Sequence, residues 1–127
     1  VAPDYRQPIV TYAENQLIIA ESAFRLGQTN TALTALNAER ADAGLPAVGS
    51  ATLSDIMTEK YIALFQNIEV WNDWKRTCLP ALTPAQGTVG GIPARLLYAQ
   101  SERNTNPNVP LPSDQPARNW NDPNACS

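Results

Sequence analysis

The sequence predicts an all-α fold that consists of a tight helical hairpin, a long third helix and a loop-rich C-terminal segment. Three observations lead to this prediction. Apolar residues recur at helical spacing up to about residue 76. Small side chains lie on both sides of Gly27, where they allow two helices to approach closely. Eight of the eleven prolines, together with six asparagines, lie after residue 77. The chain is therefore expected to be helical over 1–77 and mostly irregular over 78–127.

The first helix is predicted from Thr11 to Leu26. Thr11 can cap it, with Glu14 three residues later at the spacing of a capping box. Gly27 ends it, because glycine readily adopts the left-handed conformation that follows a helix. Its expected apolar face is wide and comprises Tyr12, Leu17, Ile19, Ala20, Ala23 and Phe24.

The second helix is predicted from about Thr31 to Ala43, with Thr29 or Asn30 as its cap and with Gly44 and Pro46 ending it. Leu33 and Leu36 are expected to face inward. Four alanines are expected where the two helices of the hairpin meet: Ala20, Ala23, Ala32 and Ala35.

The third helix is predicted to be the longest, from the Thr52 cap to about Arg76, with Asp55 completing a capping box. Its expected apolar stripe consists of Ile56, Leu64, Phe65, Ile68 and Trp71. Pro80 and Pro84 prevent its continuation. After it we expect loop, with at most one short helix near Pro93–Ser101.

The composition excludes several classes of function. The chain has no histidine, which excludes Ser-His-Asp and Cys-His catalytic pairs and histidine-ligated metals within it. A net charge of −3 with scattered basic residues argues against a nucleic-acid surface. The sequence indicates no cofactor site and no metal site, and no apolar run approaches the roughly 20 residues of a membrane span.

The only two cysteines, Cys78 and Cys126, flank the proline-rich segment. In an exported protein a disulfide between them would stabilise the fold by roughly 3–4 kcal/mol in the chain-entropy model. The alternative is two unpaired thiols in a reducing compartment. We favour the disulfide, because a free Cys126 thiol would be exposed in a polar tail.

Three segments resemble the C-terminal part of the SusD/RagB family of outer-membrane nutrient-binding lipoproteins. The first match consists of Leu36, Asn37, Arg40, Ala43, Gly44 and Leu45. The second consists of Glu59, Lys60, Leu64, Phe65, Asp73 and Arg76. The third consists of Ile92, Pro93, Arg95, Tyr98, Glu102 and Asn106. The order and spacing of the three matches carry the resemblance.

The resemblance implies a bacterial cell-surface protein of the outer membrane. Family members sit as a lid on a TonB-dependent transporter and deliver oligosaccharides or peptides to it without catalysing a reaction. Their tetratricopeptide-like helix pairs form the scaffold of the fold. Since members are several times longer and begin with a lipidated cysteine, we expect 1–127 to be the C-terminal part of one SusD-like domain. Membrane attachment would then come only from a lipid anchor on a missing N-terminal part.

Candidate ligand-binding residues are Trp71, Trp74 and Trp120, because indole rings stack on the apolar faces of sugars. The competing interpretation places Trp71 in the core, Trp74 at its rim and Trp120 as a packing anchor. Arg40 and Arg95 are each expected to form a structural ion pair with an acidic side chain, and the alternative is a role in ligand binding.

Two other functions compete with nutrient capture. A helical-repeat scaffold for protein–protein interactions is the main alternative, but further repeats at about 34 residues are not visible in the sequence. A carboxylate-based hydrolase needs no histidine, yet nothing in the sequence places two carboxylates across a cleft. We therefore expect the protein not to be an enzyme.

Overall fold

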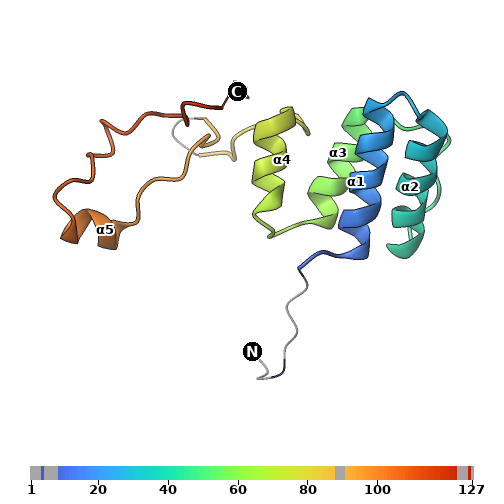
Figure 1. Ribbon diagram of the computed structural model, residues 1–127, viewed down its shortest axis with the longest axis horizontal. Coiled ribbons are helices and arrows are strands. Elements are labelled where there is room, and N and C mark those ends of the chain that lie inside the picture. Colours follow the sequence, from blue (N-terminus) through green and yellow to red (C-terminus); the bar gives the residue numbers. More distant parts are fainter. Residues whose placement is uncertain (1–3, 5–8, 88–90, 123–125, 127) are drawn as a thin grey trace. The chain divides into compact units, whose positions relative to one another are not determined.

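A computed structural model describes residues 4, 9–87, 91–122 and 126 (Figure 1). The described residues form five α-helices and no β-strand, which confirms the all-α prediction. The helices are α1 (Tyr12–Arg25), α2 (Thr29–Asp42), α3 (Leu53–Ala63), α4 (Glu69–Thr77) and α5 (Gln100–Thr105). The chain divides into an N-terminal unit, residues 1–73, and a C-terminal unit, residues 74–127, with the boundary inside α4.

The predicted hairpin is present in the N-terminal unit. There α1 packs against both α2 and α3 (Figure 1). All four predicted interface alanines are buried, and they form one core with three larger side chains: Leu17, Leu36 and Ile56. The small side chains let the helix backbones approach closely, and the larger ones fill the rest of the core. The apolar face of α1 is narrower than predicted, because Tyr12 is 52% exposed.

Local signals determine the ends of α1 and α2. The Thr11 hydroxyl accepts a hydrogen bond from the Glu14 amide at 3.1 Å, as predicted. After α1, Gly27 has φ +73° and the Gln28 amide donates to the Ala23 carbonyl, the pattern of a Schellman turn. The same arrangement, with Gly44 at φ +73°, ends α2. Because the first turn is so short, α2 already begins at Thr29, and the predicted start at Thr31 with a Thr29 or Asn30 cap is wrong.

The predicted long third helix is wrong: it is two helices, α3 and α4. The capping box of Thr52 and Asp55 starts α3 as predicted. The helix ends at Ala63, Gln66 has a positive φ of 70°, and the Asn67 side chain accepts from the Glu69 amide to begin α4. Because the break removes the helical register, Phe65 and Ile68 do not continue the predicted apolar stripe, and they are 76% and 57% exposed.

The short helix predicted near Pro93–Ser101 lies further along the chain, at α5. The Leu96 carbonyl accepts a hydrogen bond from the Gln115 side chain at 3.0 Å, so a tertiary contact occupies the group that a helix would pair internally. Side-chain bonds from Gln100 to Asn104 and from Asn106 to Glu102 stabilise α5 instead.

Candidate functional site

The three tryptophans differ sharply in exposure. Trp74 is only 3% exposed, Trp71 is half-buried, and Trp120 is 98% exposed. The expectation that Trp71 is core and Trp74 is rim is therefore reversed. Trp74 presents no free indole face for a sugar, and among the three predicted ligand residues Trp120 has a fully accessible ring.

Trp120 lies on a turn that is fastened at several points within the C-terminal unit. The Asp122 amide donates to the Asn119 carbonyl at 3.1 Å, which closes the turn. The Asp122 carboxylate lies 3.2 Å from both the Lys75 ammonium and the Arg118 guanidinium. An exposed indole is therefore held on an anchored turn.

A disulfide joins Cys78 to Cys126 across 48 positions of sequence. The Cys126 sulfur also contacts the Trp74 carbonyl oxygen at 3.4 Å. The disulfide and the Lys75–Asp122 ion pair thus tie the end of the chain to the last turns of α4. Together they make the second half of the chain a closed loop.

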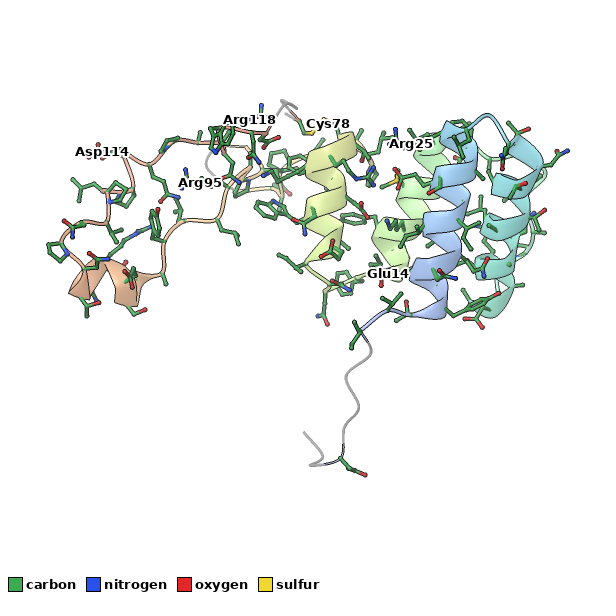
Figure 2. The ribbon with its side chains drawn as sticks, in the orientation of Figure 1. Glu14, Arg25, Cys78, Arg95, Asp114 and Arg118 are labelled. Carbon is green, nitrogen blue, oxygen red and sulfur yellow. A yellow bond between two sulfur atoms is a disulfide. The ribbon has the colours of Figure 1, made fainter. Side chains whose placement is uncertain are left out.

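A groove of about 560 Å³ lies in the C-terminal unit, between residues 91–97 and the pair Ala117–Arg118. We call it the Arg95 groove. Its lining is mostly apolar, and its two charged side chains are Arg95 and Arg118, which Figure 2 shows in the same part of the chain. The predicted ion pair of Arg95 is wrong, because this side chain has no acidic partner among the described residues. A guanidinium group offers several N–H donors and no acceptor, so this lining favours the binding of an acceptor such as a carboxylate.

In the N-terminal unit a second depression, of about 330 Å³, lies between α2, the following loop and α3. Its charged groups already have partners. Arg40 hydrogen-bonds Glu59 and the Pro46 carbonyl, which confirms the predicted structural ion pair. The Asp55 carboxylate accepts from Thr52, and these hydrogen bonds lower the pKa of Asp55 below its usual value. The main role of these charged groups is to hold the loop between α2 and α3.

A third depression, of about 360 Å³, lies between α1 and α2. Its lining is neutral, with Gln16, Asn30 and Thr31 beside Ile19 and alanines. Without a charged group or an exposed aromatic ring, this surface offers only weak hydrogen bonding to a ligand.

Sequence reasoning missed two features of the molecule. One is a buried ion network in which Lys60 lies 2.8 Å from Asp73 and 3.9 Å from Glu21. The other is the Arg95 groove, whose only sequence signal is the cluster of apolar residues in IPARLL within a segment rich in proline and asparagine.

No helix in the described part of the chain is long and apolar enough to span a membrane. A comparison of the chain with models of known protein families, with curated proteins and with solved structures found no match.

Proposed function

We propose that this chain belongs to a non-catalytic nutrient-binding protein of the SusD/RagB type at the bacterial outer membrane. It would help deliver an oligosaccharide or a peptide to a TonB-dependent transporter, and residues 1–127 would serve mainly as helical scaffold. The resemblance of three sequence segments motivates this proposal.

The single observation that carries the proposal is that residues of the first two matching segments contact each other. Arg40, from the first segment, hydrogen-bonds Glu59, from the second. Asn37 holds the intervening loop, because its amide group donates to the Val48 carbonyl at 3.0 Å and accepts from the Val48 amide at 2.8 Å. Gly44 supplies the left-handed residue that redirects the chain after α2. These residues fasten α2, the loop and α3 into one scaffold.

Some of the remaining matching residues also have structural partners, although Arg95 has no ion-pair partner among the described residues. In the second segment Lys60 pairs with Asp73 inside the N-terminal unit. In the third, the Asn106 side chain donates to Glu102 at 2.7 Å. Because these polar side chains already bond to other residues of the chain, they support a scaffold role for the matching segments rather than direct contact with a nutrient.

A helical-repeat scaffold is less well supported. Repeat folds need about three or more stacked units to bury a continuous core. The N-terminal unit contains one hairpin and α3, and the hairpin residues Ala20, Ala35 and Leu36 are already covered. The tetratricopeptide-like character of the hairpin remains part of the proposal.

The test is a binding panel of oligosaccharides and short peptides, measured by calorimetry with the native protein. Product analysis by mass spectrometry follows each titration. We expect saturable binding of at least one nutrient class and recovery of the ligand unchanged. Hydrolysis of a bound ligand would overturn the proposal, as would a panel on which nothing binds.

A further inference from the structure

The Arg95 groove exposes large apolar side chains at the surface of the C-terminal unit. Leu96 and Leu97 are 65% and 61% exposed, and both line the groove. Solvent-exposed leucines that adjoin each other along a concave surface are typical of sites that another molecule covers. The volume of about 560 Å³ suits a short segment of chain rather than a single side chain.

The backbone beside the groove has unused hydrogen-bonding groups. Residues 96–99 form no helix, turn or strand, and they belong to the open stretch that leads to α5 (Figure 1). In the described structure the amides of residues 95–98 donate to no other residue, while the Leu96 carbonyl accepts from Gln115. Free main-chain donors and acceptors beside apolar side chains match what a second polypeptide supplies when it pairs along an open edge.

The charge of this surface indicates the character of its partner. Residues 74–127 contain five basic and three acidic side chains, whereas residues 1–73 contain four basic and nine acidic ones. At the groove itself, Arg95 has no ion-pair partner among the described residues. The buried Nε of Arg118 also lacks a hydrogen-bond acceptor there, although its Nη2 lies 3.2 Å from Asp122. A carboxylate entering the groove would find two guanidinium groups.

We propose that the Arg95 groove binds an extended peptide segment of a partner protein that carries both apolar and carboxylate side chains. The apolar side chains cover Leu96 and Leu97, the carboxylates pair with Arg95 and Arg118, and the peptide backbone hydrogen-bonds the amides of residues 95–98. This inference depends only on the C-terminal unit and does not rest on the proposed nutrient-binding function.

Other occupants fit the groove less well. The lining residues include no aromatic ring on which a sugar could stack. A lipid tail would cover the leucines but would leave the main-chain amides of residues 95–98 without acceptors. A peptide satisfies the apolar, charged and main-chain groups together.

The direct test uses the native protein with the disulfide intact and a fluorescein-labelled seven-residue peptide composed of valine and glutamate. Fluorescence anisotropy measures its binding at low salt. We expect saturable binding that weakens about tenfold for the same peptide with lysine in place of glutamate, and also weakens as salt rises. Equal binding of the lysine peptide, or no binding of the glutamate peptide, would overturn the proposal.

Matched variants locate the site. Arg95→Gln and Leu97→Asp should each weaken binding of the glutamate peptide about tenfold. Two substitutions of the same types at exposed positions outside the groove, Arg25→Gln and Leu26→Asp, should leave it unchanged. If the control variants lose as much affinity as the groove variants, the peptide binds elsewhere and the assignment is wrong.

Hydrogen exchange on the unsubstituted protein gives an answer that does not depend on how a variant folds. The peptide should slow exchange of the amides of residues 95–98, since these become hydrogen-bond donors to it. Unchanged exchange there at saturating peptide would refute backbone pairing. A last experiment adds vesicles of phosphatidylcholine and phosphatidylglycerol as competitors of the labelled peptide. If the vesicles displace the labelled peptide at lower concentrations than unlabelled peptide does, the groove prefers a lipid and the proposal is wrong.

Discussion

The ammonium group of Lys60 lies 2.8 Å from the Asp73 carboxylate, with both side chains at least 86% buried. Glu21 approaches the same ammonium at 3.9 Å, and Arg25 pairs with the other side of Glu21 at 2.8 Å. One buried cation thus serves two carboxylates, one from α1 and one from the part of α4 that belongs to the N-terminal unit, and this links α3 to both.

Replacement of Lys60 by methionine should strongly destabilise the protein. The substitution keeps most of the side-chain volume but removes the cation from Asp73 and from one carboxylate oxygen of Glu21, and the loss of this buried ion pair should cost about 3–5 kcal/mol. Urea denaturation followed by circular dichroism measures the change. The control is Arg25→Gln, whose side chain is 48% exposed and whose loss should cost under about 1 kcal/mol. Similar costs for the two variants would contradict the assigned importance of Lys60.

Glu39 should destabilise the protein at neutral pH. It is 4% exposed, and its Oε2 has no hydrogen-bond partner among the described residues. Burial raises the pKa of Glu39, an effect that Arg40 partly opposes and Asp42 reinforces. Below the unfolded pKa both states are protonated and burial of the charge costs nothing. As pH rises through the unfolded and then the folded pKa, the penalty develops.

Glu39→Gln should therefore raise the free energy of unfolding at pH 7, and the gain should disappear near pH 3. Chemical denaturation at a series of pH values between these limits measures the difference. Glu14→Gln removes the same charge near the start of α1 and should show no such gain. A Glu39→Gln variant that is less stable than the parent at pH 7 would mean that the carboxylate has a favourable partner.

Gly44 and Gly49 give a matched test of backbone conformation. A Cβ atom would meet nothing within 4 Å at either position, but only Gly44 has a positive φ, of 73°. Gly44→Ala should cost about 1 kcal/mol, because an alanine in that conformation is strained. Gly49→Ala should be neutral or stabilising by up to about 1 kcal/mol through the unfolded state. In thermal melts, Gly44→Ala should lower the melting temperature, whereas Gly49→Ala should leave it unchanged or raise it. Equal shifts for the two variants would argue against the Schellman turn after α2.

Loss of the Cys78–Cys126 disulfide should loosen the C-terminal unit. Its 48-residue separation corresponds to about 4 kcal/mol in the chain-entropy model. The double variant Cys78→Ser/Cys126→Ser should lose protection from proteolysis in residues 78–122 while α1 and α2 stay protected. Peptide mapping by mass spectrometry after limited digestion detects the difference. Unaltered cleavage in that range would show that the loop is held by other contacts.

Sequence alone predicts the elements whose determinants are local. The Thr11 and Thr52 caps and the glycines at 27 and 44 act within a few residues, so the hairpin and the start of α3 follow from them. The break at Gln66 was missed because the apolar spacing from Ile56 to Trp71 is compatible with one helix. The Arg95 groove was missed because it requires Ala117 and Arg118 to return beside residues 91–97, and no local pattern encodes that return.

The central proposal, a nutrient-binding protein held at a TonB-dependent transporter, is tested most directly by isolation of the native polypeptide. Cells that produce it are fractionated, the protein is captured from mild detergent with an antibody against α2, and the eluate is analysed by mass spectrometry. The proposal predicts that the protein is recovered from the outer-membrane fraction as a lipid-modified polypeptide heavier than 13.8 kDa. It also predicts that a TonB-dependent transporter is present in the same eluate. Recovery of an unmodified 13.8 kDa polypeptide without a transporter would contradict it.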